Sequence, residues 1–362
     1  IIIITEWKDM DLRNSLDKAP VGVIGAGSFG TAVANLLAEN GRVILYSNRS
    51  EAVDKMKAER SNIGQQLHEN IIPTNNIQDV TNNCYLIFPA LSSDKFRTTI
   101  QGFAPHLKPD HIIIHCTKGF DIHKEDGTSL VDKDLKISLT DVKTMSQVIL
   151  EETCVKRVGC MSGPNLAREI ANLQPAATVI ASKFDEVIRE GESAIRSKRL
   201  QVYGNNDIYS VELAGVLKNS MALAAGALGG LGFGQNAMAF LITRGIGEII
   251  RLATAMGGNK NAFLGLAGIG DLVATCTSPL SRNYTVGARL AKGETIEHII
   301  ATSSEVAEGI KTVNISKKIS ESKNIRTPII DNIYKVIYED LSVEKALQYL
   351  MEYRWGQDAD YV

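Results

Sequence analysis

One glycine-rich stretch near the start of the chain has the spacing of a phosphate-binding loop. Gly25-Ala-Gly-Ser-Phe-Gly30 matches the pattern G-x-G-x-x-G and lies between an apolar run and a helical pattern. In such a loop the first glycine permits a tight turn, the second lets backbone N–H groups approach a pyrophosphate, and the third lets a helix pack closely on a strand. The pattern predicts a dinucleotide site in which the start of the helix faces the phosphates.

The position that discriminates between NAD and NADP lies about 20 residues further on. Tyr46-Ser-Asn-Arg49 occupies it and contains no carboxylate. A carboxylate would accept hydrogen bonds from the ribose 2′-hydroxyl and repel a 2′-phosphate, whereas Arg49, next to Asn48, could pair with that phosphate. NADP therefore fits this position. NAD stays open, because Glu51 is close by and Arg49 equally fits a solvated loop.

Lys218 lies in a helical pattern on a face of small apolar residues. Its neighbours at i−4, i−3, i+4 and i+7 are Ala214, Gly215, Ala222 and Ala225. On such a face a lysine either extends to water or is held in a pocket with room for a ligand, and the spacing favours neither. In a pocket, partial desolvation would lower the pKa of the lysine and make it a usable acid or base near neutral pH.

Two further polar groups follow apolar runs. Lys118 follows residues 111–116, and Gly163 and Asn165 follow residues 157–161. In an open parallel sheet, ligands bind beyond the carboxyl ends of the strands, so both groups are candidates for one crevice. The alternatives are a solvated lysine in a turn and an asparagine that caps a helix.

Residues 265–283 add a second glycine-rich segment with polar residues. Three glycines precede Asp271, and Ser281, Arg282 and Asn283 place a hydroxyl, a guanidinium and an amide side by side. Arginine suits bidentate recognition of a phosphate. Alone, the segment also fits a helix connection with a capping aspartate and an exposed arginine.

The composition limits the class of protein. The 362 residues are 44% hydrophobic and 22% charged, which is typical of a globular chain of about two domains. A net charge of −2 provides no sequence-wide field that would gather nucleic acid or an anionic membrane. Five cysteines without a C-x-x-C pair argue against a zinc site and a disulfide framework, so we expect no metal and a reducing, cytoplasmic location. The apolar residues 1–4 are far fewer than the roughly 18 that a membrane span needs, and we expect a peripheral strand or a disordered tail there.

Alternating apolar runs and helical patterns must position these residues. They predict a doubly wound, Rossmann-like, mostly parallel sheet over residues 1–207, followed by an all-helical domain over residues 208–362. The helix expected at 237–257 is apolar nearly all round, which predicts burial at the centre of its domain or in a subunit interface. Strands are expected at 21–24, 42–46, 84–89, 111–116, 157–161, 177–181 and 200–203, and helices at 31–39, 166–171, 211–229, 237–257, 286–293, 304–323, 328–339 and 343–353.

In their order, these motifs resemble those of the NAD(P)-dependent glycerol-3-phosphate dehydrogenases. The resemblance implies an enzyme that transfers a hydride reversibly between NAD(P)H and dihydroxyacetone phosphate, giving sn-glycerol 3-phosphate for glycerophospholipid synthesis. It also implies a cytoplasmic homodimer. The similar stretches are residues 23–31, 117–119, 162–165, 217–219, 229–236, 265–272 and 281–287.

The resemblance implies roles for individual residues as well. Lys218 matches the lysine that protonates the ketone oxygen, with Lys118 and Asp271 completing the polar group around it. Arg282 and Asn283 match residues that hold the substrate phosphate. The other expected substrate contacts are Gly163, Asn165, Thr275 and Ser281, and the expected cofactor contacts are Gly25, Gly27, Ser28, Phe29, Gly30, Asn48, Arg49, Lys118, Ala167, Arg282, Val306 and Glu308.

Two other functions fit parts of the pattern. A β-hydroxyacid dehydrogenase has the same two-domain plan and a helix-borne lysine, and it would hold a carboxylate where we expect a phosphate. A nicotinamide-binding redox sensor would keep the glycine loop but would not need Lys118, Lys218 and Asp271 together. Because His298 is the one histidine in the helical half, lysine chemistry is favoured over a histidine proton donor.

Overall fold

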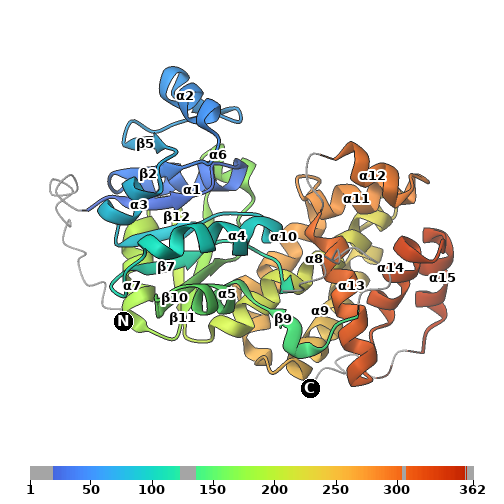
Figure 1. The fold of residues 1–362 in the computed structure, drawn as a ribbon. Coiled ribbons are helices and arrows are strands. Elements are labelled where there is room, and N and C mark those ends of the chain that lie inside the picture. Colours follow the sequence, from blue (N-terminus) through green and yellow to red (C-terminus); the bar gives the residue numbers. More distant parts are fainter. Residues whose placement is uncertain (1–18, 123–135, 304–306, 355, 357–362) are drawn as a thin grey trace, which may run out of the picture.

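An α/β part and an all-helical part make up the chain, as the sequence predicted (Figure 1). The computed structural model describes residues 19–122, 136–303, 307–354 and 356. The expected strand or tail at residues 1–4 and the expected cofactor contact Val306 lie outside the described residues. In Figure 1 the blue-to-green α/β part and the orange-to-red helices lie on opposite sides, with α8 (Ile208–Gly230) between them.

The α/β part contains one eight-stranded sheet. Its strands pair in the order β12-β11-β10-β7-β6-β1-β2-β5. Every pairing is parallel except that of β10 with β11, so the sheet is mostly parallel, as predicted. The strands are β1 (Val21–Ile24), β2 (Val43–Tyr46), β5 (Ile71–Thr74), β6 (Leu86–Pro89), β7 (Ile112–His115), β10 (Arg157–Ser162), β11 (Ala176–Ser182) and β12 (Leu200–Asn205).

Strand β5 was not predicted. It is a four-residue edge strand that contains Pro73, and proline is tolerated in a sheet mainly at an edge because it cannot donate a ladder hydrogen bond. Two short antiparallel pairs accompany the sheet: the hairpin of β3 (Ser61–Asn62) with β4 (Gln65–Gln66), and the pair of β8 (Asp121–Ile122) with β9 (Val142–Lys143).

Helices cover both faces of the sheet, which explains why its central strands are almost continuously apolar. Alternate strand residues divide between two cores: Val23 and Phe88 pack on the face of α1 and α7, whereas Ile24 and Ile87 pack on the face of α4 and α5. The helices are α1 (Ser28–Ala38), α2 (Ser50–Glu59), α3 (Ile77–Asn83), α4 (Ser93–Phe103), α5 (Met145–Glu152), α6 (Ala167–Ala171) and α7 (Asp185–Ile195).

The central helix of the helical part is α8, whose central position the sequence analysis did not predict. For the helix near 237–257 we expected burial at the centre of its domain or in a subunit interface. Helix α9 (Gln235–Ala255) is continuously buried from Gly245 to Ile250 and its first turns are partly exposed, so it is not the centre of the domain, and the interface alternative stays a prediction. Small residues let α8 take the centre, because they allow neighbouring helices to approach its backbone. The remaining helices are α10 (Asp271–Thr277), α11 (Arg282–Ala291), α12 (Ile296–Thr302), α13 (Glu308–Lys323), α14 (Pro328–Tyr338) and α15 (Val343–Glu352).

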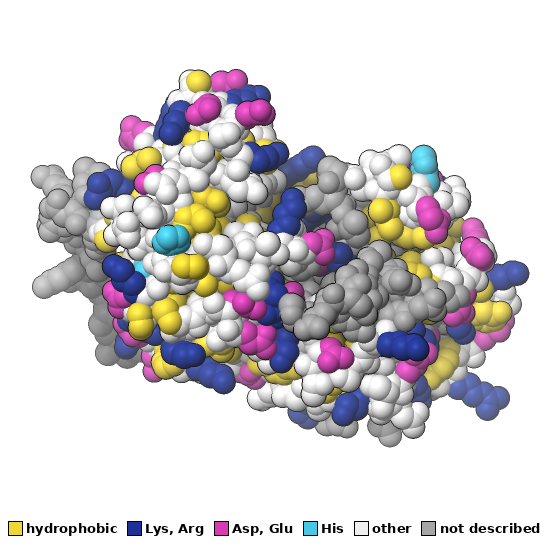
Figure 2. Space-filling view, viewed as in Figure 1, with side chains coloured by type: hydrophobic (Ala, Val, Ile, Leu, Met, Phe, Trp, Pro, Cys, Tyr) yellow, Lys and Arg dark blue, Asp and Glu magenta, His cyan; other side chains and the backbone are white. Residues whose placement is uncertain are grey.

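Helix α8 is long and apolar enough to cross a membrane by composition, yet 89% of its most apolar window is buried against the rest of the chain. That burial is typical of a core helix. On the visible surface, basic and acidic side chains are interspersed, in keeping with the net charge of −2 (Figure 2).

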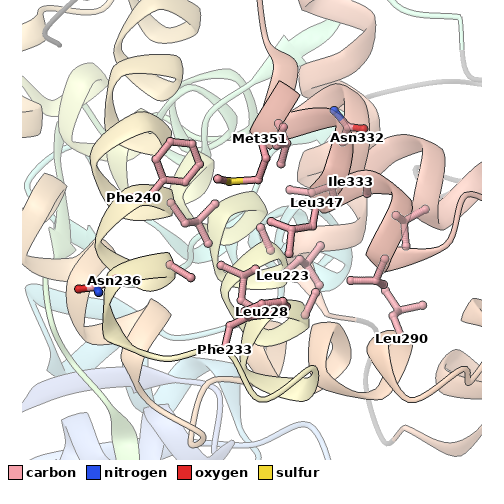
Figure 3. Close-up of a pocket in the computed structure, with 18 residues that line it drawn as sticks. Leu223, Leu228, Phe233, Asn236, Phe240, Leu290, Asn332, Ile333, Leu347 and Met351 are labelled. Carbon is pink, nitrogen blue, oxygen red and sulfur yellow. The ribbon is translucent and has the colours of Figure 1, made fainter. Parts of the chain in front are cut away.

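An apolar cavity of about 430 Å³ lies among α8, α9, α14 and α15 (Figure 3). Side chains such as Leu223, Phe240, Ile333 and Leu347 line it. None of the described lining residues is charged. The start of α9 and α15 both contribute lining residues, whereas Lys118, Lys218 and Asp271 do not.

The crossing of α8 and α11 depends on glycine. A Cβ built on Gly287 would lie 1.9 Å from the carbonyl oxygen of Leu223, and one on Gly226 would lie 1.9 Å from that of Tyr284. Backbone is therefore packed directly on backbone at this crossing. By contrast, no described heavy atom lies within 4 Å of a Cβ built on Gly102 in α4.

We predict that Gly287→Ala lowers the free energy of unfolding by about 1–3 kcal/mol or more, because the added methyl group forces the two helices apart. Gly102→Ala is the matched control, and it should be neutral or stabilising by about 0.5–1 kcal/mol. Thermal unfolding followed by circular dichroism measures both. An unchanged Tm for Gly287→Ala would contradict the close crossing.

Candidate active site

Three polar residues from distant parts of the sequence meet at the contact between the two parts. Asp271, the first residue of α10, accepts hydrogen bonds from two lysines: Oδ1 from Lys218 Nζ and Oδ2 from Lys118 Nζ, the latter at 2.6 Å. Lys118 also donates to the carbonyl oxygen of Gly163 at 3.0 Å. Lys218 donates in addition to Thr275 Oγ1 at 2.5 Å. The structure thus brings together the three residues that the sequence singled out for catalysis.

The environment of Lys218 favours loss of its proton near neutral pH. The residue is 5% exposed, and burial lowers the pKa of its ammonium group to about 8. The positive charge of Lys118 acts in the same direction, whereas the carboxylate of Asp271 opposes the shift. Of the two alternatives that the sequence left open, a pocket and a surface position, the structure shows the buried one.

Local backbone structure explains how these side chains meet. A π-helical turn, Leu266–Gly270, leads into α10 and places the carboxylate of Asp271 at a helix N-terminus, where negative charge is favoured. On α8, a Cβ built on Gly215 would lie 2.7 Å from Ser162 Oγ and 3.7 Å from Lys118 Cγ. A Cβ here would clash with Ser162 and lie in ordinary contact with Lys118, so the glycine lets α8 pack closely on the end of β10 beside the Lys118 side chain.

The glycine loop has the shape that a dinucleotide requires. Gly25 has a φ of +108°, and a Cβ there would lie 2.6 Å from the carbonyl oxygen of Ala90, while a Cβ on Gly30 would lie 1.9 Å from that of Gly25. Apart from its own chain neighbours, no described heavy atom lies within 4 Å of a Cβ built on Gly27. No described side chain caps α1. The loop thus presents the start of α1 across open space, so these residues fit a bound pyrophosphate.

The β3–β4 hairpin packs over this loop, which the sequence analysis missed. Asn62 Nδ2 donates to the carbonyl oxygen of Ala26 at 2.9 Å and to Thr31 Oγ1 at 2.7 Å. Gln65 Nε2 donates to the carbonyl oxygen of Ser28 at 2.9 Å. A turn signal, Gly64 in a stretch that contains Asn62 and Gln65, could have indicated the hairpin, but not the loop that it contacts.

Five other expected cofactor contacts lie on α1 or at elements that adjoin β1 and α1. Asn48 and Arg49 are exposed after β2, the neighbour of β1, and Arg49 is the N-cap of α2. Phe29 and Ala167 pack against the same apolar core as α1. Ser28 is exposed at the start of α1.

Glu308, the first residue of α13, lies beside the loop that carries Lys118. Its carboxylate accepts hydrogen bonds from Ser93 Oγ at 2.7 and 2.8 Å, and a Cβ built on Gly119 would lie 2.8 Å from Glu308 Oε2. Burial raises the pKa of Glu308. Nearby, Lys311 of α13 forms an ion pair with Asp94 of α4, so the two parts are joined at this edge as well.

The expected substrate contacts fall into two groups. In the first, Asn165 donates from Nδ2 to Thr178 Oγ1 at 2.8 Å. Asn165 Oδ1 and Ser162 Oγ are buried and have no hydrogen-bond partner among the described residues. Buried polar atoms are nearly always paired, so these two oxygens are available to a ligand or to water.

The second group lies at the start of α11. Ser281 accepts a hydrogen bond from the backbone of Tyr284, as an N-cap does, and Arg282 is exposed beside it. Asn283 is buried and joins helices: its Nδ2 donates to Asn219 Oδ1 at 2.9 Å, and its Oδ1 accepts from the Gly309 backbone at 2.9 Å. The sequence did not indicate this contact with Asn219.

Metal-ligating side chains are not gathered at the site. Across the described part of the chain, no group of three or more His, Cys, Asp or Glu side chains is arranged to hold an ion.

Comparison with known proteins gives the family. The model described as "NAD-dependent glycerol-3-phosphate dehydrogenase N-terminus" matches residues 20–188, and the one described as the C-terminus of the same enzyme matches residues 207–348. A glycerol-3-phosphate dehydrogenase (NAD(P)+) of Saccharophagus degradans is 38% identical over 96% of this chain and 94% of its own length. The enzyme of that name from Pseudomonas aeruginosa is 35% identical over 96% of this chain and 98% of its own length.

Solved structures of glycerol-3-phosphate dehydrogenases share the fold of this chain. A glycerol-3-phosphate dehydrogenase from Coxiella burnetii superposes with a TM-score of 0.82 at 31% identity, covering 93% of this chain and 99% of that one. The Plasmodium falciparum protein of that name has a TM-score of 0.80 at 19% identity, covering 96% of this chain and 98% of that one, and shows the shared fold. The curated relatives and the two family models favour a glycerol-3-phosphate dehydrogenase over a β-hydroxyacid dehydrogenase. The chain belongs to the NAD-dependent glycerol-3-phosphate dehydrogenase family.

Proposed function

We propose that this protein catalyses the reversible reduction of dihydroxyacetone phosphate to sn-glycerol 3-phosphate, with Lys218 as the group that exchanges a proton with the substrate oxygen. As a member of its family, the chain is an oxidoreductase that uses NAD or NADP. The nicotinamide dinucleotide, when bound, supplies the hydride in reduction and accepts it in oxidation. The observation that carries the residue assignment is the buried ammonium group of Lys218, which shares one carboxylate with Lys118 at the contact between the two parts.

Lys218 is suited to act in both directions. During reduction, negative charge develops on the carbonyl oxygen, and the ammonium group stabilises that charge and donates its proton. During oxidation, the neutral amine accepts the proton of the alcohol. Asp271 orients Lys218, and Lys118 adds a second positive charge. Two lysines on one carboxylate leave a net positive site for an anionic substrate.

We assign the phosphate of the substrate to the start of α11. The exposed guanidinium of Arg282 and the helix N-terminus both favour an anion there. Asn283 contributes by holding the turn against α8 and α13, and Ser281 caps it. Gly163, Asn165 and Thr275 complete the substrate site around Lys218. Because the phosphate is remote from the reacting carbon, its binding energy positions the carbonyl group.

The cofactor extends in our proposal from the glycine loop to Lys118. Gly25, Gly27, Ser28, Phe29 and Gly30 hold the pyrophosphate, with Ala167, Glu308 and Arg282 near the nicotinamide end. Asn48 and Arg49 lie at the ribose, where Arg49 would pair with the 2′-phosphate of NADP. Val306, the remaining expected cofactor contact, lies outside the described residues.

The domain boundary between residues 207 and 208, a homodimer, a cytoplasmic location and a role in phospholipid synthesis stay predictions.

Replacement of Lys218 tests the proposal most directly. We expect Lys218→Ala to lower kcat for dihydroxyacetone phosphate by about a hundredfold or more, the usual scale for losing such a group. The assay is oxidation of NADH or NADPH followed by absorbance. Lys317→Ala is the control, since Lys317 forms ion pairs with Glu321 and Asp331 outside the site. A near-normal kcat for Lys218→Ala would remove this residue from the mechanism.

The pH dependence should differ in sign between the two directions. Reduction needs protonated Lys218, whose pKa is lowered to about 8, so kcat should fall as pH rises through about 8. Oxidation of glycerol 3-phosphate needs the neutral amine and should become faster over the same interval. In Lys118→Met the midpoint should move upward, because Lys118 lowers the pKa of Lys218. Profiles that are flat between pH 7 and 9 in both directions would contradict the assignment.

Arg282→Ala tests the phosphate site. Charge-assisted hydrogen bonds contribute about 1.5–3 kcal/mol, so KM for dihydroxyacetone phosphate should increase about tenfold or more. The advantage of this substrate over unphosphorylated dihydroxyacetone in kcat/KM should shrink by a similar factor. Arg289→Ala, on the same helix but paired with Glu294, should leave both values unchanged. If KM were unaffected by Arg282→Ala, the phosphate would have to bind elsewhere.

A further inference from the structure

A buried polar cluster joins the two parts of the protein outside the site described above. Glu212 of α8 is 6% exposed, and its Oε1 accepts hydrogen bonds from His115 Nε2 and from the backbone N–H of Ser146, each at 2.8 Å. Its Oε2 accepts a hydrogen bond from Ser146 Oγ. His115 ends β7 and Ser146 lies in the first turn of α5, so one carboxylate is bound by two elements of the α/β part.

Glu212 does not stabilise the start of its own helix. Asp207 caps α8, accepting a hydrogen bond from the backbone of Ser210. The Glu212 carboxylate lies one turn further on and faces the α/β part, at the N-terminus of α5, where an anion is favoured. A buried carboxylate is costly unless it is hydrogen-bonded, so the three donors must stay in place. The contact therefore fixes α8 against β7 and α5.

The two catalytic lysines lie close in sequence to this contact. Lys118 follows His115 by three residues, and Lys218 follows Glu212 by six residues, which is about 9 Å along a helix axis. Between Glu212 and Lys218, Gly215 packs against Ser162 and the side chain of Lys118. Glu212 thus lies on the face of α8 that meets the α/β part, close to the place where the two lysines share Asp271.

We propose that Glu212, held by His115 and Ser146, is a positioning residue for the reaction: it sets the placement of α8 against β7 and thereby the placement of Lys218 relative to Lys118 and the substrate. The inference rests on the proposed function of Lys218. In this proposal Glu212 contacts neither the substrate nor the dinucleotide. Since a displacement of about 1 Å of a catalytic group can cost about a hundredfold in rate, loss of the contact should reduce turnover more than cofactor binding.

The test compares two buried glutamates of the helical part. Glu248, in α9, accepts hydrogen bonds from the backbone of Ile329 and Ile330 at the start of α14, away from the contact between the parts. Glu212→Leu and Glu248→Leu each remove a buried carboxylate from its donors, and both should lower Tm. Turnover with dihydroxyacetone phosphate is measured well below each Tm, and the dissociation constant for NADH is measured by fluorescence.

We expect Glu212→Leu to lower kcat about tenfold or more while the dissociation constant for NADH stays within about twofold of wild type, and Glu248→Leu to leave kcat within about twofold. Glu212→Gln keeps one acceptor oxygen for His115 Nε2 and the backbone of Ser146 and places an NH2 donor opposite Ser146 Oγ, so it should restore most of the lost kcat. The proposal is overturned if Glu212→Leu keeps kcat within twofold of wild type, or if it loses no more than Glu248→Leu.

Ser146→Ala keeps the test decisive if Glu212→Leu does not fold, because it removes only one hydroxyl group. It should lower kcat about threefold without changing NADH binding, and an unchanged kcat would then overturn the proposal. Wild-type turnover separates the two levels of inference. An inactive wild type contradicts the proposed function, whereas an active wild type with unaffected variants contradicts only the role of Glu212.

Discussion

The structure depends on keeping one ammonium group in a buried position where it can still gain and lose a proton. Lys218 lies on the most buried helix of the protein, and burial alone would drive its pKa far down. The carboxylate of Asp271 opposes this lowering of the pKa, and the same carboxylate also accepts a hydrogen bond from Lys118. The balance leaves a lysine that titrates near the pH at which an enzyme works.

This balance requires three backbone segments to meet within hydrogen-bond distance. Helix α8 brings Lys218, the loop after β7 brings Lys118, and the π-helical turn before α10 brings Asp271. Small residues make the approach possible, since Gly215 lets α8 pack closely on Ser162 beside the Lys118 side chain. Ion pairs and hydrogen bonds at the edge, including those of Glu308 and Lys311, hold the two parts together around the site.

Much of this arrangement could be predicted from the sequence. The glycine loop, the central strands and the long helices have strong local patterns, and the importance of Lys218 and Asp271 followed from their unusual neighbours and from the family resemblance. Strand β5 was missed because it is short and contains proline. The central position of α8 was missed because side-chain hydrophobicity, which singled out α9, indicates burial more directly than small side-chain size does. The contacts of Asn62 with the glycine loop and of Glu212 with His115 join residues 36 and 97 positions apart, which no local pattern indicates.

The backbone crossing of α8 and α11 bears on which molecules the protein can accept. One helix carries the lysine that we assign to the reacting oxygen, and the other begins with the arginine that we assign to the phosphate. Because main chain lies against main chain at Gly226 and Gly287, the spacing between these two helices cannot be adjusted by exchanging side chains. We therefore expect selection for substrate length to depend on the main chain at this crossing as well as on the reach of the Lys218 and Arg282 side chains.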